Sequence, residues 1–292
     1  MKRILRSGCL AILLGLLPSI AVAGGFLGGP RKYVYHPFEF PGAISTVPFG
    51  LNDRGDVVGF YRDASGGRHG FKYVNGTFNS IDISGLTGVT PRGINNLRDI
   101  VGNWADANGN GHGLILTASG QLQTLDAPGA VETAFSCIDD RRQIVGVTID
   151  QNGIEHGVRF QNGTFTPFDI PELTLDVGFF PCVNNAGTLI ATGDGRAVIL
   201  SNGLLMFLTL TSLETFTSPQ GISNRGDIVG TFAFTTSDIH GFLWSGGVLT
   251  AIEYPGAPVT QPHAINVFGT IVGEFRGADG VRHGFIARPA DP

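Results

Sequence analysis

The stretch GISNRGDIVG, Gly221–Gly230, organises the chain because it recurs along the sequence. The closing positions of its copies, at 59, 102, 146, 191, 230 and 273, are separated by 43, 44, 45, 39 and 43 residues. Repeats of this length indicate an array of identical supersecondary units. The other copies are GLNDRGDVVG from Gly50, GINNLRDIVG from Gly93, CIDDRRQIVG from Cys137, CVNNAGTLIA from Cys182 and AINVFGTIVG from Ala264.

Each unit is expected to form four short antiparallel strands. In the second unit we expect them at 89–95, 99–104, 112–117 and 121–126, joined by turns rich in Asn, Asp and Gly. No segment shows a sustained helical period. Four strands in about 43 residues are typical of a β-propeller blade.

The number and position of the strands predict a closed ring. First-to-third strand sets occur six times, and the last set, ending at 283–287, has no fourth strand after it. The segment 33–43, YVYHPFEFPGA, matches the fourth strand at 249–257, LTAIEYPGA. We therefore expect an all-β, six-bladed β-propeller with four-stranded antiparallel blades, in which the N-terminal strand completes the last blade and removes exposed edges. A solenoid of stacked β-units is the alternative, but it does not explain this split.

The repeat also resembles a known family. The pattern G-I-N-x-x-G-x-I-V-G followed by a His-Gly-Phe motif resembles the extracellular HAF repeat family of secreted bacterial proteins, over nearly all of the chain after residue 23. The chain departs from that pattern by having Gly where the family name has Ala, and by lacking the His in the fourth unit, at 196–198. The resemblance implies export and no particular chemistry.

The first residues are expected to be a secretory signal peptide. Basic residues precede an apolar run, 10–17, that is too short to span a bilayer, and Ala23 ends a small-residue cleavage site. We therefore expect a secreted or periplasmic, monomeric protein without membrane insertion. The predicted divisions are a signal peptide at 1–23, a linker at 24–32, the propeller at 33–288 and a tail at 289–292.

The net charge of the chain argues against polyanions as partners. The chain carries 19 Lys and Arg against 24 Asp and Glu, and the signal peptide holds three of the basic residues. The mature chain therefore has 16 basic and 24 acidic residues, a net charge of −8. An acidic surface without basic runs argues against nucleic acid and anionic membrane as partners.

Two cysteines follow the signal peptide. Cys137 and Cys182 hold the first position of the phrase in neighbouring units. An oxidising compartment permits a disulfide if the two Cα atoms come within roughly 7 Å. The alternative is that both are small residues in a tight position that holds Gly or Ala elsewhere, and the sequence leaves these open.

Five histidines stand ten residues beyond the closing position of a phrase and are expected to be structural. Neighbouring blades lie about 10 Å apart, too far to share a metal ion through bonds of about 2 Å. We expect each imidazole to fix a turn in its own blade through hydrogen bonds to the backbone. These histidines are His69, His112, His156, His240 and His283.

One loop resembles the start of a calcium site. Asp106, Asn108 and Asn110 have the spacing of calcium ligands, but Thr117 stands where the closing bidentate acid belongs. The corresponding loops at 63–66 and 150–153 have the composition of Asx turns. We expect no cofactor, and this loop is the one calcium candidate.

A ring of variable residues is the candidate ligand site. The residue directly before each phrase differs in every unit, although its neighbours are constrained. If the first strand of each blade lines the channel, alternation points this position, and the one two residues earlier, into it. We expect Arg92, Gln220 and His263 to form a polar core and Phe49 a stacking surface; an unused, water-filled funnel is the alternative. The six variable residues are Phe49, Arg92, Ser136, Pro181, Gln220 and His263, and those two earlier are Val47, Thr90, Ala134, Phe179, Ser218 and Gln261.

No nucleophile elbow, Cys-x-x-Cys, paired-His or phosphate-loop motif is present in the sequence. We therefore expect a non-catalytic binding or scaffold module for a glycan or a partner protein. The alternatives are an exported hydrolase or lyase that acts on a glycan or lactone at the channel mouth, and a purely structural surface protein. An enzyme should carry a Glu, Asp or His near the axis with a strongly perturbed pKa.

Overall fold

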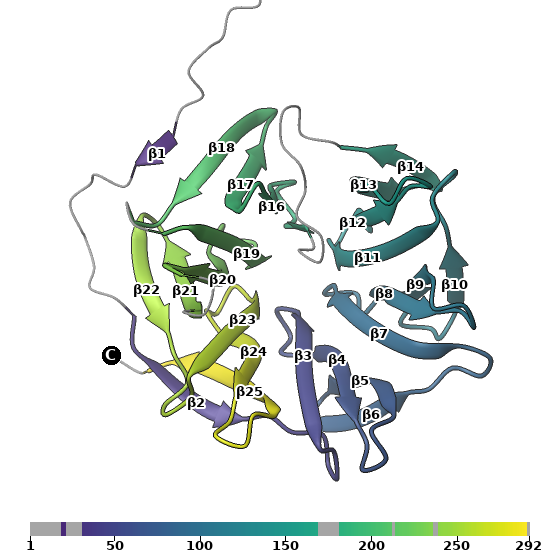
Figure 1. Ribbon diagram of the computed structural model, residues 1–292, viewed down its shortest axis with the longest axis horizontal. Helices are drawn as coiled ribbons and strands as arrows, with labels where there is room; N and C mark the ends of the chain where they lie inside the picture. The colour runs from purple at the N-terminus through teal and green to yellow at the C-terminus, as the bar shows by residue number, and fades with distance from the viewer. Residues whose placement is uncertain (1–18, 22–30, 169–180, 212–213, 236–238, 291–292) are drawn as a thin grey trace, which may run out of the picture.

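The computed structural model describes residues 19–21, 31–168, 181–211, 214–235 and 239–290. Within these ranges the protein is all-β, and its strands form six sheets that stand as blades around a central axis (Figure 1). The prediction of a six-bladed β-propeller with antiparallel blades is confirmed.

The first three blades follow one another along the chain. Blade 1 holds β3 (Ser45–Leu51), β4 (Val57–Arg62), β5 (Arg68–Val74) and β6 (Thr77–Ile81). Blade 2 holds β7 (Thr87–Ile94), β8 (Ile100–Ala105), β9 (Gly111–Leu116) and β10 (Leu122–Leu125). Blade 3 holds β11 (Glu132–Ile138), β12 (Ile144–Ile149), β13 (Glu155–Gln161) and β14 (Thr164–Pro167).

The other three blades complete the ring. Blade 4 holds β15 (Cys182–Val183), β16 (Leu189–Gly193), β17 (Arg196–Ser201) and β18 (Leu204–Thr209). Blade 5 holds β19 (Phe216–Ile222), β20 (Ile228–Ala233), β21 (Ile239–Ser245) and β22 (Val248–Ile252). Blade 6 holds β23 (Val259–Ile265), β24 (Ile271–Arg276), β25 (Arg282–Pro289) and β2 (Tyr33–Pro37).

The N-terminal strand closes the ring, as the sequence predicts. β2 is the outermost strand of blade 6 and pairs antiparallel with β25, with Tyr33 opposite Pro289 and Pro37 opposite Phe285 (Figure 1). One blade therefore joins the two ends of the propeller, and its backbone hydrogen bonds hold the circle shut.

The predicted divisions at the ends of the chain are only partly described. β1 (Ser19–Ala21) falls within the expected signal peptide and pairs parallel with β18, while the rest of 1–23 lies outside the described residues. Arg31, in the predicted linker, donates from its backbone N–H to Thr250 Oγ1 at 3.2 Å. β25 runs to Pro289, one residue beyond the predicted boundary. Among the described residues, no helix is long and apolar enough to cross a membrane.

The glycine that closes each phrase is required by the close approach of the first two strands of a blade. A Cβ atom on Gly59 would lie 2.1 Å from the carbonyl oxygen of Val47, and Gly102 and Gly230 show the same distance to their first strands. Any side chain there would collide with the backbone that it pairs with. Blade 4 has Ala191 in this position, and its first strand is only two residues long.

A β-bulge interrupts the first strand at one position. In blade 1, Pro48 pairs with Gly59 and Gly50 with Val58, so Phe49 is the extra residue on its strand. The same one-residue shift occurs in blades 2, 3, 5 and 6. A bulge changes the direction in which the side chain of the extra residue points. The side chains of these residues therefore do not follow the alternation between the two faces of their strands.

Aromatic side chains on the third strands fill the space between blades. Phe71, Phe242 and Phe285 have no exposed surface. Burying a side chain of this size stabilises the folded state by about 1.5–3 kcal/mol. Packing of one blade on the next therefore keeps the central channel at a fixed width.

Candidate ligand-binding channel

The bulged residues meet in the central channel. In Figure 1, β3, β7, β11, β19 and β23 are the labelled strands nearest the axis. A cavity of about 30 Å³ lies between them and is lined by Phe49, Arg92, Ser136, Pro181, Cys182, Gln220 and His263. The five predicted ligand-binding residues and Pro181 are thus brought together. The side chains of Phe49, Arg92, Ser136, Gln220 and His263 are partly exposed, whereas the neighbouring strand positions are mostly buried.

The second predicted position does not share this surface in three blades. Val47, Thr90 and Ser218 are at most 1% exposed and lie beneath the channel wall. The prediction assumed unbroken alternation along the strand, and the bulge interrupts that alternation. Ser218 still contributes indirectly, because its Oγ accepts a hydrogen bond of 2.9 Å from Gln220 Nε2. Phe179 lies outside the described residues.

The first strands of neighbouring blades approach each other closely at the first position of the phrase. A Cβ atom on Gly50 would lie 2.7 Å from the carbonyl oxygen of Arg92 and 3.2 Å from the Cα of Gly93. At the same level a disulfide joins Cys137 and Cys182, whose Cα atoms are 5.0 Å apart. The question that the sequence leaves open is therefore answered by a bridge between blades 3 and 4.

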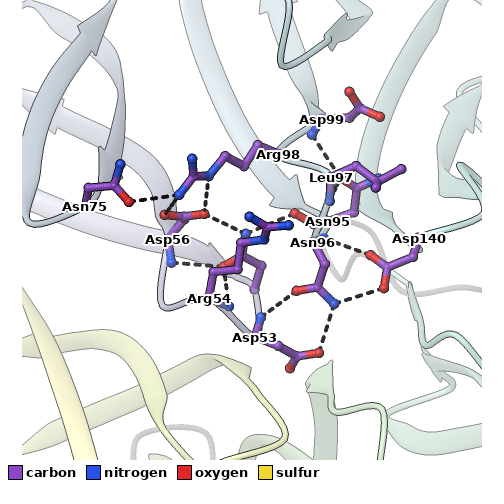
Figure 2. A network of polar contacts seen from close by, with 11 residues as sticks. Asp53, Arg54, Asp56, Asn75, Asn95, Asn96, Leu97, Arg98, Asp99 and Asp140 are labelled. Carbon is purple, nitrogen blue, oxygen red and sulfur yellow. Dashed lines mark hydrogen bonds and ion pairs between the residues drawn. The ribbon is translucent and has the colours of Figure 1, made fainter.

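Polar side chains surround the mouth formed by the phrase turns, where a second cavity of about 90 Å³ is lined by these turns and by the variable ring. Asp53 donates its backbone N–H to Asn96 Oδ1 at 2.8 Å, and Asn96 donates its backbone N–H to Asp140 Oδ1 at 2.7 Å (Figure 2). Asn185 and Asn224 continue this circle with bonds of 2.8 Å from each preceding blade. The second residue after the first strand therefore takes part in hydrogen bonds between neighbouring blades.

Buried ion pairs reinforce the same mouth. Arg98 donates from Nε to Asp56 Oδ2 at 2.8 Å and from its terminal nitrogen to Asn75 Oδ1 at 2.9 Å (Figure 2). Asp56 is only 2% exposed. Arg98 has a φ of 67°, in the region that favours glycine, and Gly55 fills the equivalent turn position in blade 1. The strained backbone is retained because the guanidinium reaches the preceding blade.

Phe49 organises the polar core of the variable ring. The guanidinium carbon of Arg92 lies 4.8 Å from the centroid of the Phe49 ring, and the imidazole of His263 meets the same ring edge-on at 5.0 Å. Arg92 also donates from Nε to Asn103 Oδ1 at 3.3 Å. Three blades therefore place an arginine, an aromatic ring and a histidine against one another.

Burial and positive charge govern the electrostatics of this core. Burial, followed by the charges of Arg92 and Arg282, lowers the pKa of His263 to about 3. Burial and the charge of Arg68 lower the pKa of Arg92 to about 9. His263 is therefore neutral at neutral pH, and its Nε2 is buried without a hydrogen-bond partner among the described residues.

Two further residues, Arg68 and Phe60, which the repeat pattern does not single out, continue this core outward. The guanidinium carbon of Arg68 lies 3.9 Å from the Phe60 ring centroid, and Phe60 lies 5.7 Å from Phe49. Arg68 is exposed, and it immediately precedes a His-Gly-Phe motif. That position also varies from unit to unit, so variation beside the motif was an available signal. Contacts between side chains therefore run from Arg68 at the surface, through the two aromatic rings, to Arg92 in the channel.

The repeated histidines are structural, but the predicted backbone partners are wrong. His69 places Nδ1 2.8 Å from Asp82 Oδ1 and Nε2 3.0 Å from Asp63 Oδ2, and it stacks on Tyr61 at 5.1 Å. These carboxylates raise the pKa of His69. The expectation failed because one acid comes from a hairpin turn and the other follows the fourth strand. Carboxylates also lie beside the other four: His112 contacts Asp106 and Asp126, His156 contacts Asp150, His240 contacts Glu253, and His283 contacts Asp279 and Glu39.

The calcium candidate has the geometry of an Asx turn. Asp106 Oδ1 accepts the backbone N–H groups of Asn108 at 2.8 Å and Asn110 at 2.9 Å. The side-chain amides of both asparagines face Asp106 Oδ2, at 3.4 and 3.2 Å. Asp63 and Asp150 form the same turn in their blades. The described residues contain no group of three or more His, Cys, Asp or Glu side chains arranged to hold a metal ion.

The chain is similar in structure to known propellers. A gluconolactonase from Xanthomonas campestris superposes with a TM-score of 0.53 and 12% identity, over 84% of this chain and 87% of that one. A mutant of AofleA from Arthrobotrys oligospora gives 0.52 and 10%, over 92% and 90%. A mutant of Aleuria aurantia lectin in complex with Fucalpha1-6GlcNAc gives 0.51 and 9%, over 84% and 93%.

These likenesses establish the fold alone, because identity is low throughout. No protein-family model and no curated protein matches the chain. The similar structures include a sugar-binding lectin and a lactone-hydrolysing enzyme, so this architecture accommodates binding and hydrolysis alike.

Proposed function

We propose that the mature chain, 24–292, is an exported, monomeric binding module of the HAF repeat type, and that a glycan docks at the channel mouth above the variable ring. The observation that carries this proposal is the bulge. In five blades it turns the variable residue into one cavity while the surrounding frame stays constant. Different side chains on a constant frame are a common basis of ligand recognition in repeat proteins.

The dimensions of the cavity define how a glycan would bind. A volume of about 30 Å³ holds one or two water molecules, which is less than a sugar ring requires. The sugar ring therefore stays at the mouth, and a substituent reaches Arg92, Gln220 and His263. Phe49 offers an apolar surface beside these polar groups, a combination typical of small-ligand sites.

The glycan class draws support from a similar fold. Aleuria aurantia lectin, whose structure contains Fucalpha1-6GlcNAc, shares the propeller architecture over most of this chain. A partner protein is the other ligand class that the sequence leaves open. A cavity of this size favours a small substituent over a protein loop, so we place the glycan first.

A hydrolase or lyase is the second candidate, and His263 is the observation that favours it. It is a histidine near the axis with a strongly perturbed pKa, as an enzyme should have. A general base works best when its pKa lies near the operating pH. A pKa of about 3 makes His263 a poor base at neutral pH, and this favours binding over catalysis.

Screening residues 24–292 against a broad glycan and polysaccharide array tests the proposal. The double variant Arg92→Ala/His263→Ala should lose the hits, and Arg54→Ala, an exposed arginine at the opposite mouth, should keep them. Thermal unfolding of each variant establishes that it is folded. Hits retained by the double variant would remove the variable ring from the site, and turnover of a hit would favour the enzyme.

A further inference from the structure

Two neighbouring blades place arginines directly opposite each other at the same hairpin. Arg62 pairs with Arg68 across β4 and β5, and Arg276 pairs with Arg282 across β24 and β25. Like charges directly opposite in a sheet are destabilising. The equivalent pairs in the other blades are Ala105 with Gly111, Ile149 with Glu155, Gly193 with Arg196, and Ala233 with Ile239.

These arginines lie on the face away from the polar ring of the phrase turns. The turn at 52–56 precedes β4, whereas Arg62 and Arg68 stand at its other end. The two arginine pairs are neighbours in space, because Ser45 Oγ of blade 1 donates a hydrogen bond of 2.8 Å to the backbone oxygen of Arg282 in blade 6. Four arginines of blades 1 and 6 therefore lie close together on this face.

Two of the surrounding acids are engaged by histidines. Asp63 of the blade 1 hairpin lies 3.0 Å from His69 Nε2, and Asp279 of the blade 6 hairpin lies 3.2 Å from His283 Nε2. Glu274 lies 3.5 Å from Arg282 and is the carboxylate paired with this cluster. Partial burial, followed by the charges of Arg62 and Arg282, lowers the pKa of Arg68.

The cluster leads inward to the variable ring. The exposed Arg68 lies over Phe60, Phe60 contacts Phe49, and Phe49 contacts both Arg92 and His263. At the inner end, the buried His263 Nε2 is without a hydrogen-bond partner among the described residues. A positively charged path that ends in such a group is suited to an anion.

We propose that this mouth, between blades 1, 2 and 6, binds the carboxylate of an acidic saccharide. The inference rests on the proposed function and specifies its ligand class. A carboxylate is small enough for the cavity, and guanidinium groups match its two oxygens. The sugar ring of a uronic acid stays at the mouth, and its carboxylate lies between Arg92 and His263. The arginine pairs at the rim draw the anion toward this position.

Sodium acetate is the first probe, because it carries a carboxylate without the sugar ring. Side-chain resonances of isotopically labelled protein are followed during titration with sodium acetate, against sodium chloride at equal ionic strength. We expect saturable shifts at Arg92 and His263 with acetate, and about tenfold weaker affinity in Arg92→Gln. Arg68→Gln, which changes an exposed side chain, should weaken affinity about two- to fivefold. Arg54→Gln should have no effect. Shifts that are equal in acetate and chloride would overturn the proposal.

Trigalacturonate, its methyl ester and a triglutamate peptide then identify the source of the carboxylate. We expect binding of the uronide only, and competition by acetate. Preference for the peptide, or equal binding of the methyl ester, would overturn the assignment. If a neutral glycan binds through Arg92 and His263 while acetate has no effect, the proposed function stands and this inference fails. If acetate binds and every saccharide fails, the anion site stands and the glycan proposal fails.

Discussion

The guanidinium of Arg92 and the ring of Phe49, contributed by neighbouring blades, lie 4.8 Å apart in the channel. A cation held over an aromatic face is stabilised by the ring, by about 0.5–2 kcal/mol depending on how dry the contact is. The contact fixes the direction in which Arg92 points, and His263 lies against the same ring. Phe49 therefore acts as a positioning residue for both polar groups.

Phe49→Leu tests this positioning role. Leucine keeps an apolar side chain but removes the aromatic face, so we expect acetate or glycan affinity to fall about fivefold. The free energy of unfolding should fall by less than about 2 kcal/mol, because Phe49 is only partly buried. Calorimetric titration and urea unfolding measure the two effects separately. Phe49→Tyr keeps the ring and should retain affinity; unchanged affinity in both variants would show that Phe49 positions nothing.

His263 should make stability depend on pH. Its folded pKa of about 3 lies below the unfolded value of 6.5, so the unfolded chain binds a proton first as the pH falls. Stability is therefore greatest above pH 6.5 and declines between pH 6.5 and 3, by about 3 kcal/mol at pH 4. Urea unfolding from pH 4 to 7 measures this slope. His263→Gln should flatten it, and an equal slope in that variant would place the titrating group elsewhere.

Arg98 should contribute to stability although its side chain is only partly buried. Asp56 is buried, and removing its partner leaves an uncompensated charge between blades 1 and 2. We therefore expect Arg98→Ala to lower the free energy of unfolding, and by more than the loss of an exposed, unpaired side chain does. Arg54→Ala, an exposed arginine two positions before Asp56, should change it by less than about 0.5 kcal/mol. Equal effects in urea unfolding would mean that Asp56 does not depend on Arg98.

The disulfide between Cys137 and Cys182 should stabilise the junction of blades 3 and 4. Closing a loop with a sequence separation of 45 residues contributes about 2–4 kcal/mol, chiefly by restricting the unfolded chain. Dithiothreitol should therefore lower the melting temperature of the natural protein. The variant Cys137→Ser/Cys182→Ser should melt at the reduced temperature with or without reductant. A melting temperature that does not change with dithiothreitol would show that the disulfide does not contribute to stability.

The fold was predictable because each repeat contains the local signals for its turns and strands. Each phrase supplies a turn and a closing glycine, such as Gly59, whose absent Cβ lets two strands approach. Ring closure was predictable because the match between 33–43 and 249–257 leaves one place for the N-terminal strand. The candidate site could be proposed for a similar reason. The positions of Arg92 and His263 hold a different residue in each repeat, whereas the neighbouring positions are constrained.

Side-chain contacts between strands and turns were not predictable. Arg68 and Phe60 lie on the third and second strands, and only the folded blade places them in line with Phe49. The acids that hold His69 come from a hairpin turn and from beyond the fourth strand, so neither sequence position marks the pair. The bulge likewise depends on pairing between strands, and it buries Val47 while exposing Phe49.

The most direct test of the central claim is to map where a bound ligand contacts the protein. Amide and side-chain resonances of residues 24–292 are followed during titration with the strongest ligand from the glycan array. We predict the largest shifts at Phe49, Arg92, Gln220 and His263, with little change at the polar ring around Asn96. Shifts confined to the outer strands or to the mouth at Asn96 would contradict the account, because the ligand would then bind without contacting the variable ring.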